Sequence, residues 1–422
     1  MKVLGLIVEY NPMHNGHLYH LNAAKKIVKP DYTVAVMSGN FCQRGEPAII
    51  NKFARTLMAL KNGIDIVFEL PTVFSLQDAG GFAFGAISLL NNLKIVTDLV
   101  FGSESNDSEF LKQIAEVLYN QPENFDYLLK KELKKGYSYP NARKYALKNF
   151  LKFDSENLSK IEKSNDILGI EYIHSLLKLN SHIKFHTIKR IGSNYNDETL
   201  KGTISSATAI RNAIKNNFDY SQALPPNNFK IISDELKEGR GPVFFESFET
   251  FVLPYLRKMK RSDLEKIYGF KEGLDIRFIH AANNAGDLKE FLDLVKTKRF
   301  TYSRIRRLLF YSIFNFDKKL IEDSNKYGPQ YFRILGFTKK GQNLLSIIKK
   351  QVNRPLISTA SNYKKILEKI LKDTEKDWDV IPELYLKQFE MDILASNIYS
   401  YFYPNKSQRK SGMDFREPIM IE

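Results

Sequence analysis

The chain has 422 residues, of which 43% are hydrophobic and 26% charged, a composition that predicts a globular protein of two or three domains and excludes a largely disordered one. It contains no run of about 18 apolar residues, so no membrane span is expected, and its single cysteine, Cys42, excludes an intramolecular disulfide and a cysteine-rich metal site. The net charge of +15 indicates a polyanionic partner, with an ordinary lysine-rich protein as the alternative, and the composition fits a cytoplasmic location.

The first half of the chain alternates short apolar runs with helical patterns. Each apolar run predicts a strand that ends at a loop signal and is followed by a helix. The predicted strands are 2–8, 32–37, 65–70, 97–101 and 183–189, and the predicted helices are 16–28, 51–62, 77–93, 108–119, 165–179 and 206–215. Apolar strands that alternate with helices form a parallel sheet covered on both faces, and ligands bind at the carboxyl ends of its strands.

Two segments interrupt this alternation. Residues 121–160 are rich in Lys, Tyr and Asn and predict a mostly helical insertion. Residues 224–241 are polar and contain turn residues, so they predict a domain boundary, after which the pattern is mainly helical. The expected fold is therefore α/β, with a Rossmann-like domain over 1–230, a mainly α-helical C-terminal domain over 242–403 and a flexible tail over 404–422.

The stretch after the first predicted strand has the features of a phosphate site. The apolar run ends at Val8, a turn-rich segment follows, and His14-Asn15-Gly16-His17 leads directly into a helix. Free backbone amides and the positive end of the helix dipole face an anion at such a helix start. Two imidazoles can also donate hydrogen bonds to phosphoryl oxygens, and Gly16 lets a ligand approach closely. The alternative is a strand, a turn and a helix with two incidental histidines.

This stretch resembles the His-x-Gly-His signature of the nucleotidyltransferase superfamily, which shares its fold with the class I aminoacyl-tRNA synthetases. Residues 164–172 resemble the Asn-x-x-Leu-Gly-x-Glu-Tyr motif of the superfamily, and residues 204–211 resemble its Ile-Ser-Ser-Thr-x-Ile-Arg motif. In the last stretch Ala207 follows the paired serines and Thr208 comes next, so which hydroxyl contacts phosphate stays open. A capped helix explains each of the two later stretches alone, but all three occur in the expected order.

Further segments resemble one branch of the superfamily, the bacterial tRNA(Met) cytidine acetate ligases. These segments extend over nearly the whole chain: 8–12, 37–47, 51–55, 68–71, 101–104 and 296–307. The resemblance implies an enzyme that activates acetate with ATP, giving acetyl-adenylate and diphosphate. It also implies that the acetyl group passes to the exocyclic amine of the wobble cytidine in elongator tRNA(Met), with release of AMP.

The resemblance assigns roles to individual residues. His14, His17 and Arg211 are expected to be catalytic, because they can stabilise the charge that builds on the phosphate oxygens. The residues expected to contact ATP are Ile7, Val8, Glu9, Tyr10, Asn11, Pro12, Met13, His14, Asn15, Gly16, His17, Leu18, Tyr19, His20, Gly102, Asn165, Arg190, Ile191, Ser205 and Ser206. ATP makes Mg²⁺ an expected companion, but no clustered carboxylates identify a metal site.

The strongest basic run lies in the second half of the chain. Residues 246–422 carry 33 basic and 23 acidic side chains, against 30 and 25 in residues 1–245. Cations contact backbone phosphates, and the interleaved Phe300 and Tyr302 can stack on unpaired bases, although a solvated helix face is the alternative. The residues expected to bind tRNA are Lys296, Lys298, Arg299, Arg304, Arg306 and Arg307.

Two other functions stay open at this stage. A small-molecule adenylyltransferase shares the His-x-Gly-His core but needs no long basic second half. A tRNA-binding protein that has lost catalysis is the other, and the intact His14, His17 and Arg211 argue against it. Lys52 and Arg55, one helical turn apart, suit either contact with phosphate or tRNA or a solvated helix face.

Overall fold

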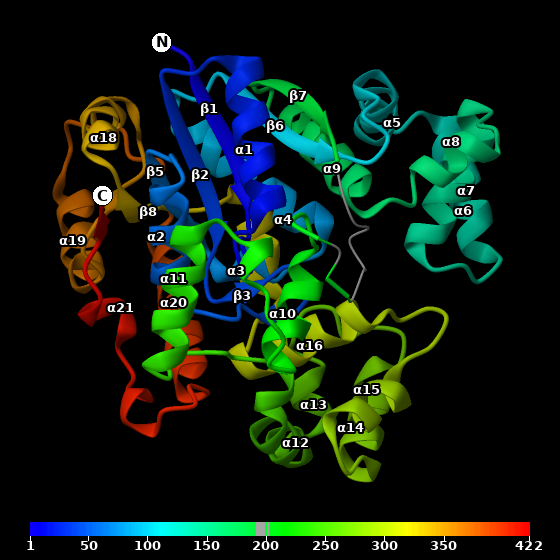
Figure 1. The fold of residues 1–422 in the computed structure, drawn as a ribbon. Helices are drawn as coiled ribbons and strands as arrows, with labels where there is room; N and C mark the ends of the chain where they lie inside the picture. The colour runs from blue at the N-terminus through cyan, green and yellow to red at the C-terminus, as the bar shows by residue number, and fades with distance from the viewer. Residues whose placement is uncertain (191–198, 201) are drawn as a thin grey trace.

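The computed structural model describes residues 1–190, 199–200 and 202–422. Its centre is an eight-stranded sheet in the order β10-β8-β5-β2-β1-β6-β7, with β9 beside β8 (Figure 1). The first half of the chain contributes five strands that pair in parallel: β1 (Val3–Val8), β2 (Tyr32–Ser38), β5 (Ile66–Leu70), β6 (Asp98–Ser103) and β7 (Lys184–Lys189). A small antiparallel hairpin, β3 (Phe41–Cys42) and β4 (Glu46–Pro47), follows β2.

Helices follow most of these strands, as the alternating pattern predicts. Side chains fix where several helices begin, because Asn51, Asp78 and Asp107 each accept a hydrogen bond from a backbone amide of the first turn. The helices are α1 (Asn15–Val28), α2 (Lys52–Lys61), α3 (Thr72–Ser75), α4 (Ala79–Asn92), α5 (Ser108–Asn120), α9 (Ser164–Lys178), α10 (Ala207–Lys215) and α11 (Pro226–Lys237). The predicted α/β class and the five predicted strands of this half are confirmed.

The insertion between α5 and α9 is helical, as expected. It contains α6 (Glu123–Lys134), α7 (Tyr139–Leu151) and α8 (Ser155–Lys160), and it forms a unit at one side of the molecule (Figure 1). Phe125, Ala146 and Leu147 are buried, so the unit packs through apolar contacts of its own.

The second half is mainly helical, yet it also extends the sheet. Its helices are α12 (Glu249–Lys258), α13 (Arg261–Leu264), α14 (Leu274–Asn284), α15 (Leu288–Val295), α16 (Tyr302–Phe314), α17 (Lys318–Tyr327), α18 (Lys339–Gln351), α19 (Tyr363–Lys372), α20 (Pro382–Tyr401) and α21 (Met413–Arg416). The strand β8 (Phe332–Phe337) pairs antiparallel with β5, and β9 (Leu356–Ile357) and β10 (Met420–Ile421) pair in parallel with β8. None of the described helices is both long and apolar enough to cross a membrane.

These three strands correct the sequence reading of the second half. The periodicity of residues 332–337 does not predict a strand, because the buried Arg333 interrupts the apolar run. The segment 404–422, expected to be a flexible tail, instead contains α21 and β10, and its Asp414 is buried.

One hydrophobic core joins the two halves of the chain. The ring of Phe41, in β3, lies 4.8 Å from that of Phe310 and 5.0 Å from that of Phe314, both in α16, measured between centroids. Tyr399 of α20 also contacts this ring, and its hydroxyl donates a 2.7 Å hydrogen bond to the carbonyl of Ala48. The packing therefore fixes α16 against the hairpin that follows β2.

Candidate active site

The loop between β1 and α1 presents two imidazoles at the start of a helix. The ring of His14 caps α1, because its Nδ1 accepts the amide proton of Gly16 at 3.0 Å. The Nδ1 of His17 accepts the amide proton of His14 at 3.3 Å, and the two ring centroids are 3.8 Å apart. A neutral imidazole that accepts through Nδ1 carries its proton on Nε2. Each ring therefore has an Nε2–H to donate to a ligand.

Burial keeps both imidazoles neutral in the free protein. It lowers the pKa of His14 to about 3, and the charges of Arg190 and Arg211 act in the same direction. Burial, the field of His14 and that of Arg190 hold the pKa of His17 well below its usual range. An anion bound here would raise the pKa of both imidazoles, since a negative charge favours their protonated form. The pair is thus suited to donate hydrogen bonds to phosphate oxygens.

The start of α10 lies against this loop. The side-chain amide of Asn15 donates to the carbonyls of Thr203 and Gln222, both at 2.9 Å. The guanidinium of Arg211 donates to the carbonyl of Asn11 at 2.9 Å and to the hydroxyl of Thr208 at 3.2 Å. Two motifs that are about 190 residues apart in sequence therefore meet at the end of β1.

The paired serines of the motif 204–211 have structural partners. Ser206 caps α10, with its hydroxyl accepting the amide proton of Ala209 at 3.0 Å, and the hydroxyl of Ser205 donates to the carbonyl of Gly202 at 3.2 Å. Thr208 is the hydroxyl of this motif that contacts Arg211. The role of Ser205 and Ser206 in ATP binding stays a prediction.

The third side of the site joins the loop after β6 to the first turn of α9. The side-chain amide of Asn165 donates to the carboxylate of Glu104 at 2.6 Å, and the backbone amides of Asn165 and Asp166 donate to the same carboxylate. In return, the carboxylate of Asp166 accepts the amide protons of Glu104 at 3.1 Å and Ser105 at 3.0 Å. This reciprocal clamp positions Asn165, and the sequence reading missed both acids.

Gly102 and Arg190 lie on the same side of the site as Asn165. A Cβ atom at Gly102 would be 4.0 Å from Cδ2 of His20, so bare backbone faces that ring. The amide of Arg190 donates to the carbonyl of Ser103 at 3.0 Å, which continues the pairing of β7 with β6. Ile191, also expected to contact ATP, lies outside the described residues.

Arg55 is a further residue whose role the sequence reading missed. It is fully buried, and its guanidinium donates to the carbonyls of Glu9 at 2.7 Å, Ser38 at 3.1 Å and Ile50 at 3.2 Å, and to that of Gly39. Because these carbonyls lie just after β1, at the end of β2 and just before α2, Arg55 ties the three segments together. The expectations of a phosphate contact or a solvated helix face are wrong for Arg55, and Lys52 is equally buried.

Glu46 connects the site to the helical half. Its carboxylate lies 3.6 Å from Nη2 of Arg211 and also accepts a hydrogen bond from Arg306. Nη1 of Arg307 donates to the carbonyl of Gln43 at 3.3 Å, and a Cβ at Gly45 would be only 2.6 Å from the amide nitrogen of Arg307. The first turns of α16 therefore pack directly on the β3–β4 hairpin beside Arg211.

The expected tRNA-binding residues consequently separate into two groups. Arg306 and Arg307 face the hairpin, whereas Lys298 is exposed and Arg299 pairs with Glu272 at 3.0 Å while remaining about half exposed. Arg304 lies over the ring of Phe300. Phe300 is buried, which corrects its expected role in stacking on bases. Lys296 lies near the exposed ring of Tyr302.

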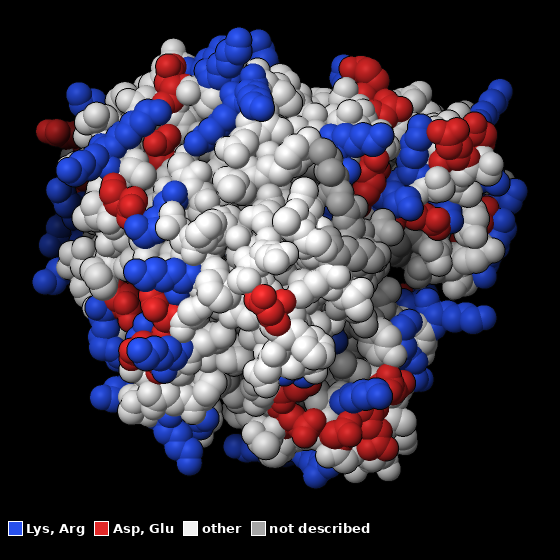
Figure 2. Space-filling view, in the orientation of Figure 1, with Lys and Arg blue, Asp and Glu red and all other residues white. Residues whose placement is uncertain are grey.

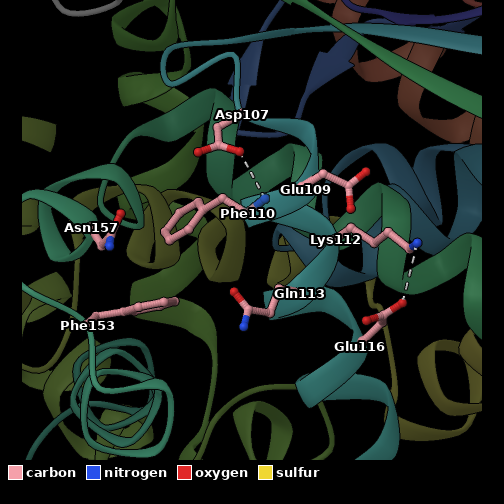
Figure 3. Close-up of a pocket in the computed structure, with 8 residues that line it drawn as sticks. All are labelled: Asp107, Glu109, Phe110, Lys112, Gln113, Glu116, Phe153 and Asn157. Carbon is pink, nitrogen blue, oxygen red and sulfur yellow. Dashed lines mark hydrogen bonds and ion pairs between the residues drawn. The ribbon is translucent and has the colours of Figure 1, made fainter.

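A surface pocket of about 520 Å³ lies elsewhere, between α5 and the insertion (Figure 3). Its lining includes Asp107, Glu109 and Glu116 but only one cation, Lys112, which pairs with Glu116 at 3.8 Å. Three carboxylates disfavour a phosphate ligand by charge repulsion. The pocket is therefore distinct from the site at the end of β1.

The part of the chain that the structure describes offers no set of side chains that could bind a metal ion. Among these residues, no group of three or more His, Cys, Asp or Glu side chains is arranged to hold an ion. The prediction that Mg²⁺ accompanies the nucleotide thus depends on the phosphates as its ligands.

Known proteins are similar to this chain over almost its whole length. Residues 1–414 match the HIGH Nucleotidyl Transferase family. The chain is 61% identical over 422 residues to the tRNA(Met) cytidine acetate ligase of Thermosipho africanus (strain TCF52B), and the alignment covers 100% of both chains. The chain belongs to the tRNA(Met) cytidine acetate ligase family.

Solved structures of another member of this ligase family share the fold. The tRNA(Met) cytidine acetate ligase of Thermotoga maritima is 52% identical over 98% of this chain and 99% of its own. The crystal structure of Thermotoga maritima TmcAL in its apo form I matches with a TM-score of 0.96 over 100% of this chain and 99% of that one. A second crystal structure, bound with alpha-thio ATP, matches with a TM-score of 0.93 at 51% identity and the same coverage.

The buried imidazoles predict how the stability of this ligase depends on pH. Burial lowers the pKa of His20 to about 4, and His14 and His17 shift in the same direction. Below pH 6.5 the unfolded chain binds protons that the folded chain does not, so the free energy of unfolding falls as the pH decreases towards 4. The expected loss is about 1.4 kcal/mol per pH unit for each fully shifted histidine. Urea unfolding of ligand-free protein at pH 7 and pH 5 measures it.

The variant His20→Asn isolates one of these contributions. It should lose less stability than the wild type between the two pH values, because one titrating group is gone. The exposed His182→Asn serves as the control. Equal losses in the wild type and in His20→Asn would contradict the prediction.

Proposed function

We propose that this protein activates acetate with ATP and acetylates the wobble cytidine of elongator tRNA(Met). The observation that carries the proposal is the meeting, at the end of β1, of the His14/His17 pair and Arg211, with the basic start of α16 attached to the same place through Glu46. Nucleotide activation and an RNA acceptor are thereby combined in one site. The reaction belongs in the cytoplasm, where ATP, acetate and tRNA meet.

The first step forms acetyl-adenylate. An oxygen of the acetate carboxylate bonds to the α-phosphorus of ATP, the bond from that phosphorus to the bridging oxygen breaks, and diphosphate leaves. Negative charge builds on the phosphate oxygens during this step. The Nε2–H groups of His14 and His17, the start of α1 and the guanidinium of Arg211 supply donors for that charge. Mg²⁺ held by the nucleotide phosphates would add further charge compensation.

The second step transfers the acetyl group. The exocyclic amine nitrogen of cytidine bonds to the acetyl carbonyl carbon, the bond from that carbon to the AMP oxygen breaks, and the amine loses a proton. The wobble cytidine must therefore lie beside the adenylate. The packing of α16 on the hairpin supports this arrangement, because it brings cations of the second half to the edge of the nucleotide site.

The decisive experiment uses the purified protein, ATP, labelled acetate and total tRNA. The tRNA is then digested to nucleosides for mass spectrometry. Acetylated cytidine that requires both ATP and acetate, with AMP released, is the expected result. Absence of label from tRNA that is still bound by the protein would instead indicate a non-catalytic tRNA-binding protein. Absence of both label and binding would favour the small-molecule adenylyltransferase.

The exposed members of the basic run give a separate prediction about tRNA. The double variant Lys298→Ala/Arg299→Ala removes two cations without touching the β3–β4 hairpin, which Arg306 and Arg307 contact. We expect the KM for tRNA to rise several-fold, and the slope of log affinity against log salt to decrease by about 1 to 2. Acetylation kinetics and tRNA binding over a salt series measure both quantities.

The matched control removes two exposed lysines from α19, Lys365→Ala/Lys369→Ala, on another side of the molecule (Figure 1). Both double variants lower the net charge by the same amount. A salt slope that decreases equally in the two would place the tRNA footprint outside the run 296–307.

A further inference from the structure

The end of α6, the connection after it and the first residue of α7 form a strongly basic surface that the site described above does not use. This segment, residues 130–139, is called the α6–α7 turn below. It contains four lysines and one acid, Glu132, and the longer segment 130–152 carries eight basic side chains against that single acid. Glu132 is buried and pairs with Lys135 at 2.7 Å, and Lys130 pairs with Asp126 at 2.5 Å. Lys131 and Lys134 are exposed, and neither forms an ion pair with another described residue. Their charges are available to an anionic partner.

Aromatic rings lie beside these cations. Tyr139 is 57% exposed, whereas the ring of Tyr137 is held against that of Tyr145 with centroids 4.9 Å apart. Gly136 adopts a φ of +84°, and a Cβ placed on it would meet nothing within 4 Å. Open space therefore lies beside Gly136, and Figure 2 shows Lys and Arg side chains projecting from the outer edge of the insertion. Exposed rings among cations suit stacking on unpaired bases.

The turn has a fixed position relative to the site. Arg143 of α7 forms an ion pair with Glu171 of α9 at 2.5 Å, which anchors the insertion on α9. Tyr139 and Arg143 are about 6 Å apart along α7, and Glu171 and Asn165 are about 9 Å apart along α9, at 1.5 Å per residue. Even with the two paired side chains added, the turn is on the order of 25 Å from Asn165. A duplex advances about 3.4 Å per base pair, so a nucleic acid bound at the site spans this distance in roughly seven or eight base pairs.

We infer that the α6–α7 turn is a second contact for the RNA substrate. Lys131 and Lys134 bind backbone phosphates, and Tyr139 stacks on an unpaired base. The inference rests on the proposed function, since it is the reacting cytidine in the site that brings the rest of the RNA towards the insertion. An RNA satisfies both features of the turn, the cations and the exposed ring, whereas an acidic protein segment uses only the cations.

The test compares three variants of the full-length protein with the wild type. Lys131→Ala/Lys134→Ala removes the free cations, Tyr139→Ala removes the ring, and Tyr139→Phe retains a ring that can stack. The control is again Lys365→Ala/Lys369→Ala on α19. The measurements are the KM for tRNA in acetylation, direct binding of tRNA by filter retention over a salt series, and acetate-dependent ATP–pyrophosphate exchange without tRNA.

We expect the lysine variant and Tyr139→Ala to raise the KM and the dissociation constant for tRNA five-fold or more. Tyr139→Phe and the α19 control should stay within two-fold of the wild type, and exchange should be unchanged in all four. If the lysine variant and Tyr139→Ala bind tRNA as tightly as the α19 control, the inference is overturned. A wild-type protein that binds tRNA without acetylating it would contradict the proposed function instead, and the binding data would still decide on the turn.

Discussion

Replacing His17 by alanine is expected to lower acetate-dependent ATP–pyrophosphate exchange about 100- to 1,000-fold, while binding of tRNA stays near the wild-type level. The imidazole is neutral, since burial holds its pKa well below the usual range, and it accepts the amide proton of His14 through Nδ1. In the proposed function, its Nε2–H is the donor that binds the phosphate oxygens. Removing such a preorganised donor costs roughly 3 to 4 kcal/mol of transition-state stabilisation.

A second imidazole provides the matched control for this substitution. His186 lies on β7 and pairs with Asp98 at 2.8 Å, away from the loop between β1 and α1. His186→Ala should leave exchange within about two-fold of the wild type, because this ring does not face the nucleotide site. Thermal unfolding of both variants separates a loss of catalysis from a loss of folding, since the lost Nδ1 acceptor at the start of α1 costs about 1 kcal/mol. Unchanged exchange in His17→Ala would remove the proposed role of the histidine pair.

Replacing Lys52 by methionine is expected to lower the free energy of unfolding by about 3 to 5 kcal/mol. The ammonium of Lys52 is fully buried and lies 2.7 Å from the carboxylates of both Glu69 and Asp414. Arg333 contacts the same two carboxylates, at 3.2 Å and 2.7 Å. Without Lys52, two buried carboxylates share one cation, and a buried charge without its partner is costly.

This cluster also fastens the end of the chain to the sheet. Asp414 lies in α21, Glu69 in β5 and Arg333 in β8. Nearby Asp392 of α20 accepts hydrogen bonds from the amide of Thr72 and the hydroxyl of Tyr331, and burial with the field of Glu69 raises its pKa. The Lys52→Met substitution should therefore expose residues 404–422 to protease as well as shift the urea midpoint.

An exposed ion pair serves as the control for Lys52. Lys61 lies 3.0 Å from Glu422, and both side chains are about one-third exposed. Lys61→Met should cost less than about 1 kcal/mol, because water screens and solvates both charges. Urea unfolding of the two variants measures the difference. Equal stability of Lys52→Met and Lys61→Met would show that the buried cluster does not hold the end of the chain in place.

Local patterns in the sequence predicted the strands and most helices of the first half of the fold. The strands of the first half could be predicted from short apolar runs, since a parallel sheet buries both faces, and the turn signals after them predict where ligands bind. Several helices begin close to where the patterns predict, and only the structure shows that Asn51, Asp107 and Ser206 cap three of them. The histidine pair and Arg211 were readable because helix starts and cations have a known preference for phosphate, and the structure brings them together at the end of β1.

Contacts between distant residues could not be read in the same way. The sequence by itself determined the α/β class, the three motifs of the site and the excess of positive charge. Only the tertiary structure decided that Arg55 and Lys52 are buried, that Glu46 links Arg211 to α16, and that β8 and β10 extend the sheet. The physical reason is that a charged side chain on a helix has the same local pattern whether water or a distant carboxylate solvates it. The packing of distant segments decides which group pairs with that side chain, and the local periodicity of the sequence contains no information about it.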